Sequence, residues 1–155
     1  MHTVIKQNDL INLSHYFAAM FDKNWTSHDP NTLICCKYKI PTITINDFDQ
    51  RAVKFLFEAV AESEEWFCWQ YVDFNVLVDI IRMIDYYSIE FNKQTYLSHL
   101  KEWKIGKNDA LDVIEGIEKL EKIDSLKEIC EHVENNAALV LAKKLKVSFF
   151  LFFII

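Results

Sequence analysis

Apolar side chains recur along this chain with the three-and-four spacing of amphipathic helices. The first such stretch follows Ser14, whose hydroxyl can accept hydrogen bonds from the exposed N–H groups of a helical first turn. Ser14 is therefore the predicted N-cap of a short helix. Its apolar face should hold Leu13, Phe17, Met20 and Phe21.

Between residues 32 and 45 the pattern changes to β-forming residues. Segments 32–40 and 42–45 are both rich in such residues, and Pro41 separates them, which indicates either one bent edge or two short strands. Asp47 or Asp49 is then placed to cap a helix. That helix should bury Val53, Leu56, Phe57 and Val60.

The remaining chain to Lys146 has the pattern of successive helices. The predicted spans are 74–88, 92–102, 108–122, 125–135 and 136–146, the third of them beginning with Asn108-Asp109 after Gly106. Residues 61–73, before these helices, should form an acidic, aromatic loop. The aromatic residues of this loop are Trp66, Phe67, Trp69 and Tyr71. Their rings could form an exposed docking patch, but aromatic clusters of this kind more often fold onto the core.

Composition narrows the class of protein. The chain has 155 residues, 51% of them apolar, which is enough for one domain with a core, with or without a short appendage. Only two Gly and two Pro favour a helix-rich fold. With a net charge of −6 and no visible cluster of basic residues, the chain is not expected to bind nucleic acid. Residues 1–8 lack a signal peptide, and the four Cys fit neither a zinc site nor a disulfide framework, so reduced thiols in a cytoplasmic or nuclear protein are expected.

The last nine residues, 147–155, are almost wholly apolar. They are too few to cross a bilayer, which takes roughly 20 apolar residues, so no membrane partner is expected. Without helical periodicity, they suggest an apolar strand or a disordered end. Val-Ser can be encoded by a common intron start, and T-rich introns translate into Phe, Leu and Ile. We therefore expect this tail to be read-through from an incomplete gene model.

Three motifs follow one another in an order that resembles the BTB/POZ domain, a protein-interaction module. They are Leu13 to Phe21, Ile43 to Asp49 and Ile84 to Glu90, within a match over residues 3–92. Residues 108–141 resemble the helical extension of MATH-BTB and BTB-BACK adaptors. The resemblance implies an α+β fold. A BTB/POZ-like helical cluster with a small incomplete β-sheet would occupy 1–92, a helical BACK-like extension 93–146, and the apolar tail 147–155.

The chain departs from the family pattern in three places. It begins at the end of the family's second strand, without the opening strand and helix that build much of the homodimer interface. Cullin-binding members carry a hydrophobic residue, any residue and then Glu, where this chain has Trp25-Thr26-Ser27. Residues 29–40 look like an insertion, and Ala61-Glu62-Ser63 stands where the family has Tyr-Thr-Gly. The first departure weakens the expectation of a homodimer, and the second weakens the expectation of cullin binding.

The resemblance implies an adaptor that links a bound protein to a cullin-type ubiquitin ligase. The residues expected on its partner face are Phe21, Trp25, Ser27 and Tyr87. Trp and Tyr are enriched at interface hot spots. The alternative is that Tyr87 belongs to the core and Trp25 packs under its loop.

Other functions stay open at this point. The chain could be an oligomerisation or scaffold module that does not bind cullin, which Ser27 in place of Glu favours. It could be a Skp-like adaptor that holds an F-box helix, since the two families share a core fold, or a fragment of a duplicated gene. The five His show no ligand spacing, and no nucleophile motif or Gly-rich phosphate loop is present, so we expect no enzyme activity, metal or cofactor.

Overall fold

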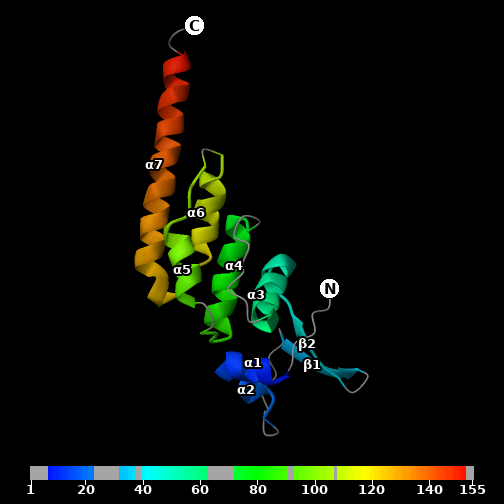
Figure 1. Cartoon of the computed structure of the whole chain (residues 1–155). Helices are drawn as coiled ribbons and strands as arrows, with labels where there is room; N and C mark the ends of the chain where they lie inside the picture. Colours follow the sequence, from blue (N-terminus) through cyan, green and yellow to red (C-terminus); the bar gives the residue numbers. More distant parts are fainter. Residues whose placement is uncertain are drawn as a thin grey trace. The chain divides into compact units, whose positions relative to one another are not determined.

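A computed structural model describes residues 7–22, 32–37, 40–62, 72–90, 93–106 and 108–152. These residues form seven α-helices, a 3-10 turn and a β-hairpin (Figure 1). The chain divides into two compact units. The first contains Met1–Tyr71 and Met83–Phe91, and the second contains Val72–Arg82 and Asn92–Ile155. One helix, α4 (Phe74–Tyr86), contributes its two ends to different units.

The first unit is built from short helices and one hairpin. Its elements are α1 (Gln7–Leu13), α2 (His15–Met20), β1 (Thr32–Lys37), β2 (Ile40–Ile45), α3 (Gln50–Glu62) and the end of α4. The predicted apolar face of α2 is confirmed for Phe17 and Met20, which are buried. Leu13 is also buried but is the last residue of α1, and Phe21, the C-cap of α2, is half-buried. Other core residues of this unit are Leu10, Ala52, Leu56, Phe57, Met83, Ile84, Tyr87 and Ile89.

The two strands form one antiparallel hairpin. The register runs from Thr32 opposite Ile45 to Lys37 opposite Ile40. Pro41 is the second residue of β2 and lies opposite Cys36. Within the described parts of the chain β1 and β2 pair only with each other, so each has an outer edge there, and a proline without an N–H is tolerated in such an edge strand.

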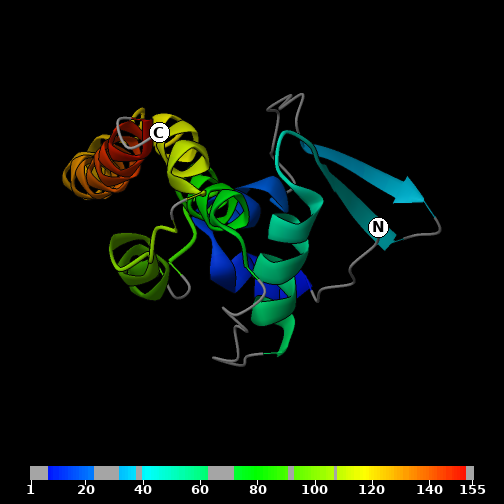
Figure 2. The same ribbon diagram turned by 90° about the horizontal axis from the view of Figure 1, so that it is seen from above.

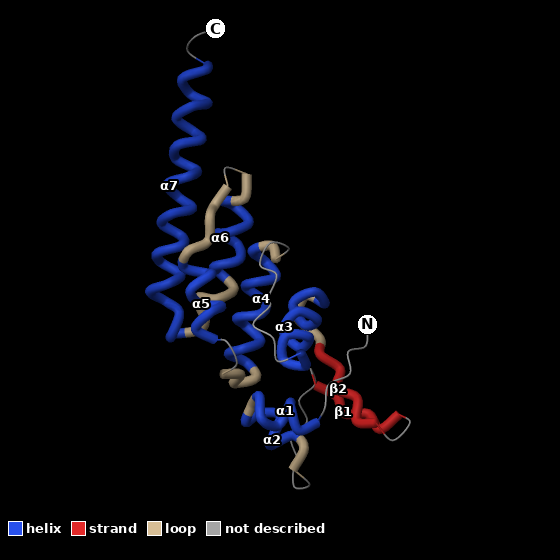
Figure 3. The backbone as a smooth tube through the Cα atoms, viewed as in Figure 1, coloured by secondary structure: helices blue, strands red, loops and turns tan. Residues whose placement is uncertain are grey.

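The expected α+β fold class is wrong for the part of the chain that the structure describes. That part is mostly helical, and its strands form one two-stranded hairpin, which is no sheet layer (Figure 3). The physical reason is the length of the β-forming pattern. It supplies two short strands, and an isolated hairpin is at best marginally stable, so the helices supply the described core. Residues 3–5, proposed as a strand end, lie outside the described residues.

The second unit consists of helices. It holds the first part of α4, α5 (Lys93–Lys101), α6 (Ala110–Glu118), the 3-10 turn η2 (Asp124–Leu126) and α7 (Lys127–Phe152). Helix α7 packs against α5 and α6, and α6 lies beside it in both views (Figures 1 and 2). The buried residues of α6 and α7 are Ala110, Val113, Gly116, Ile117, Cys130, Val133 and Ala137.

Helix α7 differs from the sequence prediction in its length. The expected boundary between Asn135 and Asn136 is absent, and one helix runs through both. Asn136 Nδ2 lies 3.1 Å from Nε2 of His132, one turn earlier. Asn is only modestly less favourable than Ala inside a helix, so burial of the face around Val133 decides the local structure. The helix continues through 147–152, residues for which the sequence suggested a strand or a disordered end.

Candidate interaction surface

Ser14 joins two distant parts of the first unit. It is the N-cap of α2, as predicted, and its Oγ accepts from the N–H groups of Tyr16 at 3.0 Å and Phe17 at 3.4 Å. The same hydroxyl donates to the backbone oxygen of Tyr87. Ser14 and Ile89 also form an antiparallel bridge. The start of α2 is thereby held against the chain that follows α4.

The end of α4 determines which aromatic side chains face the core. Ser88 has φ of 50°, and the N–H groups of Ser88 and Ile89 donate to the carbonyls of Asp85 and Ile84, a Schellman arrangement. This turn directs Ile89 and Tyr87 inward, since both are 0% exposed. The preceding residue, Tyr86, is 45% exposed.

Four aromatic rings surround that of Tyr87. Phe17 stacks on it, with ring centroids 5.1 Å apart and planes at 21°. Tyr86, Tyr16 and Phe48 lie at 4.9, 5.1 and 6.1 Å from its centroid. These three rings are exposed or half-buried, and the Tyr86 ring contacts the other two, at 6.2 Å from Tyr16 and 6.1 Å from Phe48. We call Tyr16, Phe48 and Tyr86 the aromatic patch.

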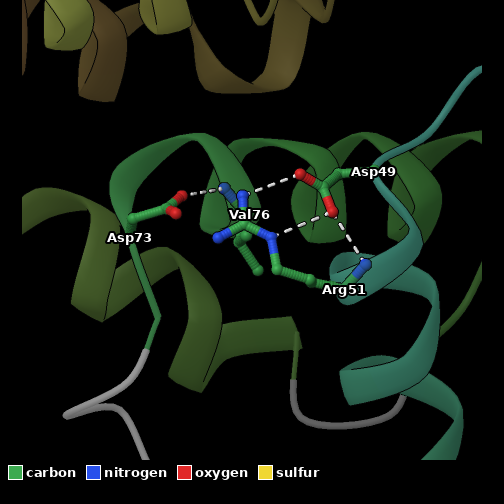
Figure 4. A network of polar contacts seen from close by, with 4 residues as sticks. All are labelled: Asp49, Arg51, Asp73 and Val76. Atoms are coloured by element: carbon green, nitrogen blue, oxygen red, sulfur yellow. Dashed lines mark hydrogen bonds and ion pairs between the residues drawn. The ribbon is translucent and has the colours of Figure 1, made fainter.

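Hydrogen bonds at the start of α3 hold the residue that follows Phe48. Asp49 Oδ1 accepts from Arg51 N at 2.7 Å and from Arg51 Nε at 3.2 Å, and Oδ2 accepts from Arg51 Nη2 at 2.8 Å (Figure 4). The hydrogen bond from the Arg51 side chain holds the pKa of Asp49 below its ordinary value. Of the two caps predicted for this helix, the structure selects Asp49, while Asp47 adopts φ of 69° in the preceding turn.

Helix α4 begins with a similar cap in the second unit. Asp73 Oδ1 accepts from the N–H of Val76 at 2.9 Å (Figure 4). A carboxylate in this position satisfies one of the exposed N–H groups of the first turn and complements the positive end of the helix dipole. The start of α4 is therefore set by local sequence.

The residues predicted for the partner face are placed differently by the structure. Phe21 is the C-cap residue of α2, half-buried, with its N–H bonded to the Phe17 carbonyl. Tyr87 is fully buried among other rings, so its side chain supports the aromatic patch from beneath. Trp25 and Ser27 lie outside the described residues, as do Trp66, Phe67, Trp69 and Tyr71.

The aromatic patch itself was not predicted from the sequence. Two adjacent tyrosines at a helix end must point about 100° apart, so one of the pair leaves the core, and this was the available signal. The resemblance placed Tyr87 on the partner face, whereas the structure buries Tyr87 and exposes Tyr86. Phe48 carried no comparable signal, because it lies in a turn between β2 and α3.

The described side chains show limited potential for metal or thiol chemistry. Among them no three His, Cys, Asp or Glu gather as a metal site would require. Cys130 is buried, and burial raises the pKa of its thiol, with Glu121 and Glu134 raising it further. This cysteine therefore stays protonated and packs as an apolar side chain. None of the described helices has the length and apolar character needed to cross a membrane.

Comparisons of this chain with protein-family models, curated proteins and solved structures found no match.

Proposed function

We propose that this chain is a protein–protein interaction module that docks a partner through the aromatic patch of its first unit. The observation that carries the proposal is the 45% exposure of Tyr86 beside the half-buried Tyr16 and Phe48. Tyrosine combines a large apolar ring with a polar hydroxyl, and it is enriched among the residues that dominate binding energy.

The mounting of these rings supports a docking role. Tyr86 and Tyr16 both pack edge-on against the buried ring of Tyr87, at 86° and 71°. A side chain that is already held by its neighbours loses little rotamer freedom when a partner binds. Ser14 adds to this rigidity through its hydrogen bonds at both the start of α2 and the Tyr87 carbonyl.

We propose further that the partner is a cullin scaffold and that the chain brings a bound protein to a ubiquitin ligase. The support is the resemblance of Leu13 to Phe21, Ile43 to Asp49 and Ile84 to Glu90 to BTB/POZ adaptors. By that resemblance Phe21 and Tyr87 belong to the partner face. Phe21 ends α2, the helix that carries Tyr16. The same resemblance assigns Trp25 and Ser27, which lie outside the described residues, to this face.

Replacing Tyr86 with alanine tests the docking surface. We expect the dissociation constant for a cullin N-terminal domain to rise about tenfold or more, because the substitution removes a large contact ring and leaves the buried Tyr87 in place. Isothermal titration calorimetry measures the change, and circular dichroism checks the fold. The control is Leu111→Ala, which truncates a side chain 61% exposed in the second unit and should leave binding unchanged. An unaltered dissociation constant for folded Tyr86→Ala would remove the aromatic patch from the proposal.

Ser27 separates the cullin adaptor from a scaffold that does not bind cullin. Ser27→Glu introduces the carboxylate of cullin-binding members, so for a cullin adaptor it should lower the dissociation constant several-fold. Ser27→Gln is the uncharged control. The same titration with a cullin N-terminal domain measures both dissociation constants. Absence of binding by both the wild type and Ser27→Glu would favour the scaffold module. The observation that favours this second candidate is Ser27 in place of the glutamate of cullin-binding members. Co-purification of an F-box protein would instead favour the Skp-like adaptor.

A further inference from the structure

Helix α7 has two distinct faces. One packs into the second unit and holds the buried residues Cys130, Val133 and Ala137. The other is a row of residues spaced three and four apart, all of them exposed, which we call the outer stripe. It consists of Glu128, Glu131, Asn135, Ala138, Ala142 and Leu145. This spacing places the six residues along one side of the helix.

The second half of the outer stripe is apolar. Leu145 is 60% exposed, and Leu139, beside the stripe, is 58% exposed. These are two of the four large hydrophobic side chains that are exposed among the described residues. Ala138 and Ala142 lie on the same side, and their small side chains would let another helix approach closely.

Charge is divided along α7. Residues 127–136 contain three glutamates and one lysine, whereas residues 137–152 contain three lysines and no acidic residue. A parallel copy of this helix would place glutamates beside glutamates. An antiparallel copy places the acidic half of each helix along the basic half of the other, which favours pairing and selects the orientation.

We propose that α7 docks antiparallel on α7 of a second copy of this chain, through the outer stripe. With the crossing near Ala138, Glu128 and Glu131 of one copy lie at the level of the lysines of the other, Lys143 and Lys146. The arrangement is two-fold symmetric, so each contact occurs twice and the interface closes on itself. Ala138 and Ala142 of both copies lie near its centre, and Leu139 flanks them.

Glu128, in the first turn of α7, also complements the dipole of its own helix, so the experiment must separate the two effects. The double variant Glu128→Lys, Glu131→Lys makes the exposed charges of α7 mostly positive in both copies. A quadruple variant adds Lys143→Glu and Lys146→Glu, which restores complementarity between copies but does not restore the acidic side chain in the first turn of the helix. Pairing between copies predicts that the quadruple variant recovers the dimer, whereas a dipole effect alone predicts no recovery.

Sedimentation equilibrium of the full chain over a range of concentrations is the measurement. We expect a monomer–dimer equilibrium, about a tenfold weaker dimer for the double variant, recovery in the quadruple variant, and loss of the dimer in Leu139→Glu. Leu111→Glu, the same exchange on the exposed side of α6, is the control and should leave the dimer unchanged. Circular dichroism of each variant confirms that it is folded.

A wild-type chain that stays monomeric at every concentration would overturn the proposal. So would a folded quadruple variant that fails to recover the dimer, or a dimer that survives Leu139→Glu. The aromatic patch is tested separately, because Tyr86→Ala changes partner binding and should leave the dimer intact.

Discussion

Replacing Tyr87 with alanine is expected to lower the free energy of unfolding by about 3–5 kcal/mol, the usual cost of deleting a large buried aromatic side chain. Tyr87 is 0% exposed, and four other rings have centroids within 6.1 Å of its own. Truncation leaves a cavity beneath Tyr16, Phe17 and Tyr86 that backbone movement can fill only in part. Urea denaturation followed by far-UV circular dichroism measures the loss.

Tyr86→Ala is the matched control for that substitution. It removes the same side chain one position earlier, where 45% of the residue is exposed, so the loss should be about 1 kcal/mol or less. A large difference between the two variants would support the assignment of Tyr87 to the core and Tyr86 to the surface. Equal losses would contradict the arrangement of rings at the end of α4.

The second large effect is expected at Gly116, inside α6. A Cβ atom there would lie 2.7 Å from Cε1 and 2.9 Å from Cδ1 of Phe74, and 3.2 Å from Cγ2 of Val78. The Phe74 ring is buried and packs at 5.4 Å against Trp103, so it has little room to move. Gly116→Leu should therefore cost about 3 kcal/mol, through overpacking.

Gly116→Ala tests whether contact with Phe74 is the cause, because helix propensity and this contact change the free energy of unfolding in opposite directions. Helix propensity alone would make Gly116→Ala stabilising by about 1 kcal/mol, whereas contact with Phe74 opposes it, and we expect a net loss in thermal or urea denaturation. Gly106→Ala is the control, because its new Cβ would meet the carboxylate end of Asp109, an exposed side chain that can turn away. A stabilised Gly116→Ala protein would show that α4 and α6 are less closely packed than described.

Local sequence was a good guide to the helices that carry strong signals. Ser14 and Asp49 form the caps that their side-chain chemistry predicts, and α4, with its apolar periodicity, lies within two residues of its predicted ends. The prediction failed at Asn135 and Asn136, where good capping residues lie inside one helix. A cap residue favours a helix start, but packing of the neighbouring apolar face determines whether the chain bends there.

The fold class could not be predicted from the β-forming composition of one segment. Residues 32–45 have the β-forming character that the hairpin requires, and no residue among them indicates how many further strands pair with it. The number of strands in a sheet depends on pairing between segments far apart in sequence. The expected α+β sheet therefore came from a resemblance, and the described strands form a single hairpin.

What the sequence determined by itself is local: where helices begin, which face of α2 is apolar, and the division of charge along α7. Tertiary structure decided which of two adjacent tyrosines is buried, because the left-handed turn at Ser88 and the Ser14 hydrogen bond to the Tyr87 carbonyl join segments more than 70 residues apart. It also decided that one face of α7 packs into the second unit while the outer stripe stays exposed. Both outcomes depend on which surfaces meet in space, and helical periodicity alone does not specify the partner of an apolar face.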